Sequence, residues 1–236
     1  MLNLLVSPTF LQEVEFDKLF NPKLAWESLP VVLEGLPLTI AISFIGMAIG
    51  LVLGFFLSLG RTSSSIFLRW PSRLYISFMR GTPILVFLFI LYFGLPFIGL
   101  TLSAFTAAII GFGLNSAAYI AEVIRASLNS VSNGQWESSR ALGLSKWQTL
   151  WHVIVPQAVR VAMPPLTNIF LDIVKATSLA AVISVPEMIQ KAQTVIGRNP
   201  DSMTLYLLVA FIYWPLCVLI ATFQEYMERR FDFYKN

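Results

Sequence analysis

The 22 residues LTIAISFIGMAIGLVLGFFLSL, positions 38–59, contain no charged side chain. A helix of about 20 mostly apolar residues is long enough to cross the hydrocarbon core of a bilayer. The whole chain has a matching composition, since 56% of its residues are hydrophobic and only 12% are charged, against roughly 25% charged residues in soluble domains. A soluble protein could not cover its surface with so few charges, so the sequence predicts a membrane protein.

Four more apolar runs of similar length follow the first one. They cover residues 81–100, 102–121, 161–185 and 203–223. The fourth span of the five, residues 161–185, is the least uniform because it contains Asp172 and Lys175. The sequence therefore predicts an all-α fold, a polytopic membrane bundle of five transmembrane helices, with the two ends of the chain on opposite sides of the membrane.

The basic residues predict which side of the membrane each connecting segment faces. Cytoplasmic segments are enriched in Lys and Arg, and an outside N-terminus places ten basic residues inside and four outside, which favours N-out and C-in. The longest inner segment is then residues 122–160. The inner set is Arg61, Arg69, Arg73, Arg125, Arg140, Lys146, Arg160, Arg229, Arg230 and Lys235, and the outer set is Lys18, Lys23, Lys191 and Arg198.

Residues 1–32 precede the first span and are expected to form an external or interfacial segment. Asn21 followed by Pro22 is typical of a helix start, because Asn caps the free N–H groups and proline suits the first helical position. Trp26, in the apolar stretch after them, is expected at head-group depth.

Small residues recur every four positions in the first span, at Gly46, Gly50, Gly54 and Ser58. Such spacing lets two helix backbones approach closely. The neighbouring helix belongs either to the same subunit or to a second copy across a dimer interface.

Residues 132–156 predict a helical hairpin on the inner side. Ser132 with Gln135 is a capping-box pattern that opens a helix, and Gly143 suits the left-handed position that closes it. A second capping-box pattern begins at Ser145. Two short helices joined by a tight turn are therefore expected, and they serve either as a docking element or as an amphipathic hairpin on the membrane surface.

The hairpin sequence resembles the EAA loop of ABC importer permeases. That loop has Glu-Ala-Ala, three residues, Gly, nine residues and Ile-X-Leu-Pro, and here Glu-Ser-Ser stands at 137–139, Gly at 143 and Val-Ile-Val-Pro at 153–156. The Ser and Val departures preserve size class or hydrophobicity. The resemblance implies a type I importer fold in which the hairpin is the coupling helix that inserts into the ATPase subunit. It places these residues at or near the contact: Glu137, Gly143, Leu144 and Ser145.

Three other segments resemble the polar amino-acid permeases of this family. They are YISFMRGTP at 75–83, NSAAYIAE at 115–122 and KATSL at 175–179. SLAAVISVPE at 178–187, with residues 203–206 and 212–214, is most similar to the L-cystine permeases. The resemblance identifies residues 33–228 as an ABC transmembrane type-1 domain and leaves 229–236 as a cytoplasmic tail.

By this resemblance the chain is a permease that moves an amino acid, with L-cystine the best match, across the bacterial cytoplasmic membrane by alternating access. The implied partners are two cytoplasmic ATPase subunits, a second permease subunit that is either identical or a close paralogue, an extracellular solute-binding protein and the lipid bilayer. No nucleic-acid partner is expected.

The sequence predicts no catalytic site and no metal site. It contains no Gly-Lys pair, and hence no G-x-x-x-x-G-K-[ST] loop to hold the phosphates of ATP. ATP and Mg are therefore expected on the partner ATPase, with no cofactor on this chain. One histidine, His152, and one cysteine, Cys217, are too few typical ligands for zinc or haem. No nucleophile in the spans has a base beside it, so the chain is not expected to be an enzyme.

The alternative function is a self-powered secondary amino-acid transporter or channel. Such a protein needs inverted repeats or a site for a coupling ion. No internal repeat is evident in the sequence, and five spans do not divide into two equal halves. A membrane-embedded enzyme is a third possibility, for which the spans offer no catalytic constellation.

Asp172 and Lys175 are the first candidates for the substrate path. A charged side chain at mid-bilayer costs roughly 2.5–3.5 kcal/mol on insertion scales, so some interaction must offset this cost. Residues three apart on a helix can pair, and the two charges either form a structural ion pair or bind the ammonium and carboxylate groups of an amino acid.

Five more residues are candidates for the path, each with a structural alternative. Thr177 and Ser178 bind substrate or cap the backbone where the helix breaks. Asn115 contacts substrate or bonds to another helix. Arg80 gates the path through an ion pair or extends to the inner interface. Glu187, near the outer face, belongs to a gate or receptor contact, or is an ordinary solvated charge.

Overall fold

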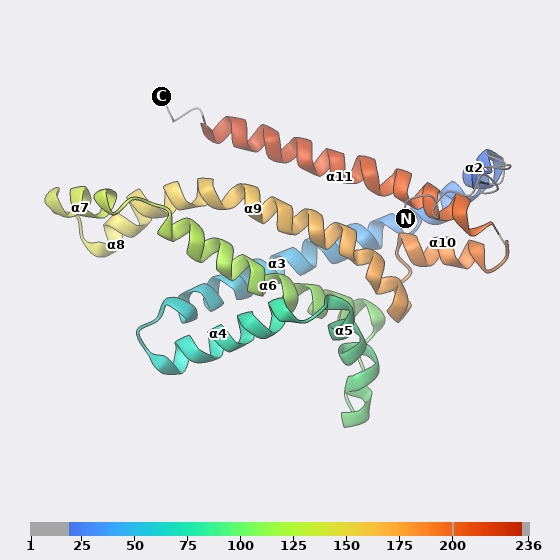
Figure 1. Ribbon diagram of the computed structural model, residues 1–236, viewed down its shortest axis with the longest axis horizontal. Helices are drawn as coiled ribbons and strands as arrows, with labels where there is room; N and C mark the ends of the chain where they lie inside the picture. Colours follow the sequence, from blue (N-terminus) through green and yellow to red (C-terminus); the bar gives the residue numbers. More distant parts are fainter. Residues whose placement is uncertain (1–18, 200, 233–236) are drawn as a thin grey trace, which may run out of the picture.

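The computed structural model describes residues 19–199 and 201–232, and every regular element in these ranges is a helix. The helices extend along one long axis (Figure 1). α2 (Pro22–Leu33) and α10 (Met188–Ile196) lie at one end, and α7 (Asn133–Ala141) and α8 (Lys146–Thr149) lie at the other. The expectations for residues 1–18 and 233–236 fall outside the described residues.

Four helical stretches are long and apolar enough to cross a membrane, and they match four of the five predicted spans. They are α3 (Leu36–Thr62), α6 (Ala104–Asn129), the continuous stretch Lys146–Ile183, and α11 (Ser202–Asp232), whose apolar part runs to Tyr226. α6 is the most enclosed, with 56% of its apolar window buried against 22–33% for the others. It is therefore the central helix, and α3, α4 and α9 pack against it.

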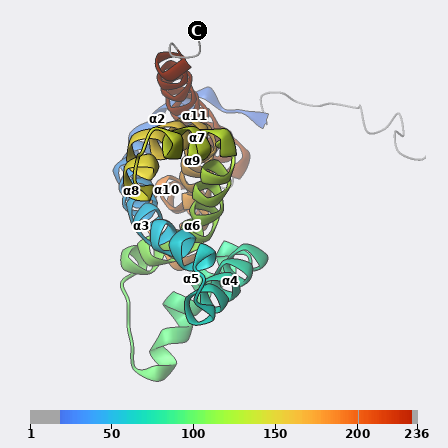
Figure 2. The same cartoon turned by 90° about the vertical axis from the view of Figure 1, so that its left-hand side faces the viewer.

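The second predicted span, residues 81–100, is not one helix. α4 (Ile66–Gly81) is followed by a bend of 103°, and then by α5 (Ile84–Phe89), a π turn η2 (Ile90–Gly94) and a 3-10 turn η3 (Leu95–Ile98). Pro83 causes the break, because a residue before proline is driven out of the helical region, and Thr82 is extended at φ −115° and ψ 134°. The count is five spans only if the bent pair is one of them. η2 and η3, which follow α5, project away from the other helices (Figures 1 and 2).

The second helix of the hairpin is not short, which corrects another expectation. α8 continues through a π turn, η4 (Leu150–Ile154), into α9 (Val155–Ala176) and a final 3-10 turn, η5 (Thr177–Ile183). Pro156 lacks an N–H and its ring would collide with the preceding turn of a regular helix. The π turn directly before Pro156 widens the helix there, so the chain continues instead of ending.

Gly46, Gly50 and Gly54 lie against α6, so the small residues of α3 serve packing within the subunit. All three are buried, as is Ser58. A Cβ atom at Gly54 would lie 2.8 Å from Ile120 Cγ2 and 3.0 Å from the Ala117 carbonyl oxygen. The two helices are therefore in backbone contact at this point.

We expect Gly54→Ala to destabilise the subunit by roughly 1–3 kcal/mol, because the added methyl group overpacks the contact with Ile120. The measurement is the thermal unfolding midpoint of the purified protein in detergent. Gly81→Ala is the matched control, since a Cβ at Gly81 meets no atom within 4 Å. Equal midpoints for the two variants would show that the α3–α6 contact is loose.

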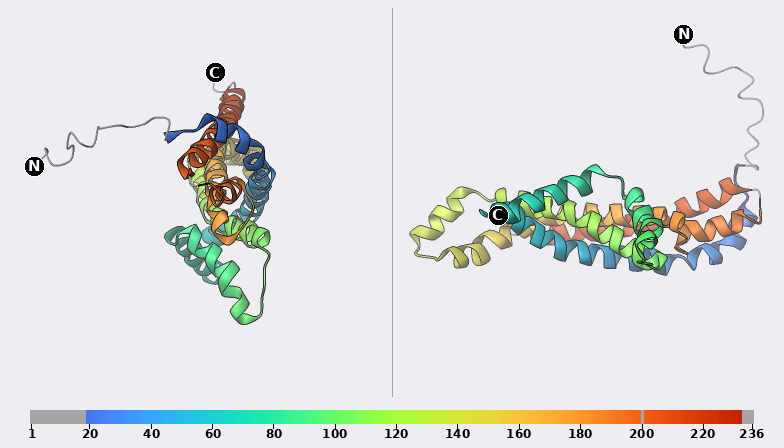
Figure 3. Two further views of the ribbon diagram at one scale, coloured as in Figure 1. Left: turned by 90° about the vertical axis from the view of Figure 1, so that its right-hand side faces the viewer. Right: turned by 90° about the horizontal axis from the view of Figure 1, so that it is seen from below.

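The end of the bundle opposite the hairpin has its own small core. Asn21 caps α2 as predicted, since its side chain accepts a hydrogen bond from the Leu24 N–H at 3.1 Å. Val32 of α2 packs with Met188 of α10 and Leu205 of α11, while Trp26 is 77% exposed. α2, α10 and the start of α11 are thus joined (Figure 3, left).

Candidate functional site

A cavity of about 270 Å³ lies among α5, α6 and α9 and contains two of the predicted path residues. Asn115 enters it from α6 and Asp172 from α9. Its other lining residues are Ile84, Phe112, Ser116, Tyr119, Ile169, Ile173 and Ala176. A mostly apolar cavity with a few polar groups is the usual form of a small-molecule site.

Asp172 and Lys175 form the predicted ion pair on α9. The Lys175 Nζ atom lies 2.8 Å from Asp172 Oδ1, and the side chains are 72% and 58% exposed for aspartate and lysine. Both residues fall inside the candidate span Lys146–Ile183. Charges at such a position face protein or a water-filled space rather than lipid, so this face of the subunit requires a covering partner or an aqueous path.

Asn115 and Arg80 both contact other helices. The Asn115 side-chain N–H donates to the Met79 carbonyl at 3.0 Å, which ties α6 to α4. The Arg80 guanidinium lies 5.5 Å from the centroid of the Tyr119 ring, a cation–π contact. Arg80 and Tyr119 also line a second cavity of about 520 Å³. Among the described residues Arg80 has an aromatic neighbour rather than the carboxylate that an ion-pair gate would need.

Thr177 and Ser178 bond to the backbone where α9 gives way to η5. The Thr177 hydroxyl donates to the Val174 carbonyl at 2.7 Å, and the Ser178 hydroxyl donates to the Lys175 carbonyl at 2.7 Å. The two hydroxyls thereby satisfy carbonyls that the change of helix type leaves free. Backbone capping is therefore the arrangement present in the structure.

Glu187 is buried, so the expectation of a solvated charge is wrong. Its side chain is 0% exposed and caps α10, accepting from the Gln190 N–H at 2.9 Å. The Tyr213 hydroxyl of α11 donates to its other oxygen at 3.1 Å and lies 3.2 Å from the Thr177 hydroxyl. Burial raises the pKa of the Glu187 carboxyl, and hydrogen bonds from backbone N–H groups and Tyr213 oppose the rise only in part.

A raised pKa in the folded state gives a definite sign to the pH dependence. The folded protein holds the Glu187 proton more tightly than the unfolded chain, so the stability linked to this group is complete at acid pH. It is lost as the pH rises through the folded-state pKa. We expect Glu187→Gln, which stays neutral, to remove that part of the decline in unfolding midpoint as the pH rises from acid values through the folded-state pKa. Glu27→Gln, an exposed carboxyl, is the control and should keep the wild-type profile. A variant profile parallel to wild type would show that Glu187 does not titrate in this range.

The turn of the α7–α8 hairpin has the geometry expected of a helix C-terminus closed by glycine. Gly143 adopts φ +79°. Its N–H bonds to the Arg140 carbonyl at 2.9 Å, and the Leu144 N–H bonds to the Ser139 carbonyl at 3.0 Å, which are the two bonds of a Schellman motif.

The caps of the two hairpin helices differ from each other. Ser145 forms the predicted capping box with Gln148. Ser132 caps α7 by accepting from the Gly134 N–H, but the Gln135 side chain accepts a hydrogen bond from Gln157 instead of completing a box. The hairpin base is thus tied to α9.

Several apolar side chains of the hairpin face outward. Leu142 is 81% exposed, Trp147 is 69% exposed and Trp151 is 53% exposed, and Glu137 and Ser145 are also exposed. The hairpin stands at the tip of the molecule (Figures 1 and 2). Its free surface therefore combines large apolar groups with polar ones, as a docking surface requires.

Three residues of these networks were not among the sequence-based candidates. Tyr119 lines both cavities, Tyr213 bonds to Glu187, and Glu122 pairs with Arg61 at 2.7 Å and Arg125 at 3.1 Å. Glu122 could have been found, because it is the single acidic residue of α3, α4 and α6. The two tyrosines lie in segments that resemble the permease family, 115–122 and 212–214, but no charge or spacing pattern distinguishes them there.

Known proteins are similar to this chain in sequence and in fold. The family described as "Binding-protein-dependent transport system inner membrane component" matches residues 50–233. The "Probable amino-acid ABC transporter permease protein YckA" of Bacillus subtilis is 54% identical over 224 residues, which cover 95% of this chain and 99% of that protein. The "L-cystine transport system permease protein TcyB" of the same organism is 43% identical over 206 residues, covering 87% and 88%.

A solved structure agrees with these sequence matches. The crystal structure of an amino acid ABC transporter with histidines has a chain that matches with a TM-score of 0.82 and 32% sequence identity, covering 85% of this chain and 94% of that one. The chain therefore belongs to the family of binding-protein-dependent transport system inner membrane components, and it is a multi-pass transport permease of the cytoplasmic membrane rather than an enzyme.

Proposed function

We propose that this chain is the permease subunit of an ABC importer that carries an amino acid, with L-cystine as the first substrate to test. The observation that carries the proposal is the Asp172–Lys175 pair, 2.8 Å apart, beside a cavity that Asp172 shares with Asn115. Relatives named for amino-acid transport, among them TcyB for L-cystine, support the choice of substrate class.

The chemistry of the pair suits a zwitterion. The ammonium group of an amino acid would bind Asp172 and its carboxylate would bind Lys175, so the substrate replaces one intramolecular ion pair by two new ones. Both side chains are more than half exposed on this subunit. A second permease subunit facing them would enclose the path, and L-cystine, which carries two groups of each kind, suits a site made from two copies.

The energy is proposed to come from separate ATPase subunits docked on the α7–α8 hairpin. The exposed Leu142, Trp147 and Trp151 side chains provide the apolar contact. In this orientation the hairpin end is cytoplasmic, in agreement with the basic residues gathered there. The end with α2 and α10 is then external and would receive a solute-binding protein.

The test is uptake by the complete transporter in proteoliposomes, supplied with its binding protein and a panel of labelled amino acids. We expect ATP-dependent accumulation of L-cystine. If a different polar amino acid is taken up instead, the proposed substrate is wrong but the proposed function as an amino-acid importer still holds. Uptake driven by an ion gradient without ATP would overturn the proposal in favour of a secondary transporter.

A further inference from the structure

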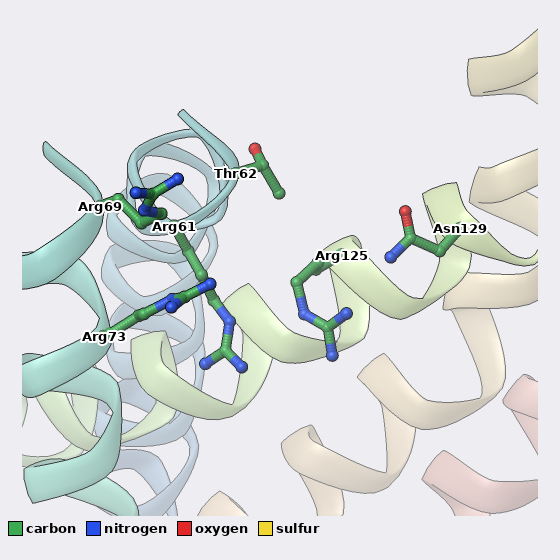
Figure 4. Close-up of a pocket in the computed structure, with 6 residues that line it drawn as sticks. All are labelled: Arg61, Thr62, Arg69, Arg73, Arg125 and Asn129. Carbon is green, nitrogen blue, oxygen red and sulfur yellow. The ribbon is translucent and has the colours of Figure 1, made fainter. Parts of the chain in front are cut away.

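A third cavity, of about 370 Å³, lies at the hairpin-side ends of α3, α4 and α6 and has a strongly basic wall. Four arginines from these three helices line it, together with Thr62 and Asn129 (Figure 4). The arginines are Arg61, Arg69, Arg73 and Arg125. It is separate from the cavity that holds Asp172 and Asn115.

Among the side chains that the structure describes, the positive charge of this cavity is not balanced. α3, α4 and α6 contain no acidic residue except Glu122, which already pairs with Arg61 and Arg125. Four arginines against one glutamate leave a net charge of +3 (4 − 1) around the cavity. Like charges this close repel one another, so an anion from outside the subunit would stabilise the arrangement.

The contacts of the individual arginines are consistent with this excess of positive charge. Arg69 and Arg73 line the cavity without a carboxylate partner among the described residues. The Arg125 Nε atom is buried and has no hydrogen-bond acceptor. Guanidinium groups bind phosphate oxygens in a bidentate manner, so the cavity has the donors for one phosphate group.

The neighbouring face of α4 indicates where the phosphate comes from. Phe67 is 86% exposed, Trp70 61%, Leu74 54% and Phe78 55%. Helical spacing puts Trp70, three residues before Arg73, on the side of α4 nearest the arginines, while Phe67, Leu74 and Phe78 lie on the opposite side. A phosphate cavity next to exposed apolar side chains at the end of the spans matches an amphiphile rather than a free anion.

We propose that the Arg61–Arg69–Arg73–Arg125 cavity binds the phosphate head group of an anionic phospholipid in the leaflet on the hairpin side, with the acyl chains along α4 beside the exposed Trp70. The identification of this leaflet as the cytoplasmic one rests on the proposed function. The lipid holds the α3–α4 turn and the end of α6 together by neutralising the arginines.

The experiment is a lipid titration of the complete detergent-purified transporter, followed by native mass spectrometry. Phosphatidylglycerol and phosphatidylcholine are compared on wild type and on the Arg69→Gln/Arg73→Gln variant. Within residues 19–199 and 201–226, neither arginine has an ion-pair partner whose loss would disturb folding. Lys23→Gln/Arg198→Gln is the matched control, because it removes two basic charges at the opposite end of the molecule, where Lys23 is 86% exposed.

We expect wild type and control to bind phosphatidylglycerol in preference to phosphatidylcholine. The Arg69→Gln/Arg73→Gln variant should bind phosphatidylglycerol about thirtyfold more weakly, at roughly a factor of five for each arginine near an anionic lipid. Unchanged binding in this variant would overturn the proposal. So would equal binding of the two lipids by wild type.

Two further arms separate other sources of the anion. Displacement of phosphatidylglycerol by inorganic phosphate at a similar concentration would assign the cavity to a free anion instead. Loss of the ATPase subunits from the variant, with lipid binding intact, would assign it to an acidic protein surface. Because no arm measures uptake, failure here is distinguishable from failure of the proposed transport function.

Discussion

Gly143→Val is expected to abolish the association of the permease with its ATPase and to reduce uptake at least tenfold. Gly143 has φ +79°, a conformation that costs an L-residue roughly 1–2 kcal/mol and a β-branched residue more. No atom lies within 4 Å of a Cβ at this position, so the effect is conformational and not a collision. The Gly143→Val variant would lose the two backbone hydrogen bonds of the turn, to the carbonyls of Ser139 and Arg140. The angle between α7 and α8 would then no longer be fixed.

Gly143→Asn provides the matched control, because asparagine tolerates the left-handed conformation. It should recover most of the ATPase co-purification and most of the uptake, although it is as large as valine. The unfolding midpoint of the permease should change little in either variant, since the hairpin tip is exposed. Normal ATPase recovery and normal uptake with Gly143→Val would show that the hairpin is not the coupling element.

Asp172→Asn and Lys175→Gln are each expected to lower uptake by roughly tenfold to a hundredfold, the range for losing one charge-assisted hydrogen bond to substrate. The mutated complexes should still assemble, as judged by size-exclusion chromatography. Neutralising Glu34 and Lys191, another ion pair at 2.7 Å but outside the candidate spans, is the control for assembly, and this variant should also form the complete complex.

The double variant Asp172→Asn/Lys175→Gln separates the substrate path from a purely structural ion pair. If the pair only stabilises the subunit, each single variant leaves an unpaired charge and is destabilised, and the double variant recovers stability and transport. If the pair binds substrate, the double variant is stable and inactive. Measuring the unfolding midpoint and uptake of all three variants decides between the two, and a stable double variant with normal uptake refutes the substrate role.

Local features of the chain were predictable from the sequence. The spans at 38–59, 102–121 and 203–223 depend on the run of apolar side chains in one segment, and hydrophobicity is a property of that segment alone. The turn at Gly143 and the cap at Ser145 depend on residues within a few positions of each other. The charge pair at Asp172 and Lys175 was equally local, because both residues lie on one helical turn.

Features that join distant segments required the three-dimensional structure. For Glu187 the sequence left open a gate or receptor contact and a solvated charge, and its burial became evident only when α11 placed Tyr213 against it, 26 residues later in the chain. The run 81–100 looked like one regular span because hydropathy registers neither the 103° bend at Pro83 that separates it from α4 nor its change from α5 to the η2 and η3 turns. In the sequence, Arg69 and Arg73 were only two of the basic residues expected on the inner side. The packing of α3, α4 and α6 brings them to one cavity with Arg61 and Arg125. Hydropathy and capping patterns act over a few residues, but burial and charge convergence depend on which helices become neighbours, and that follows only from the packing of the whole bundle.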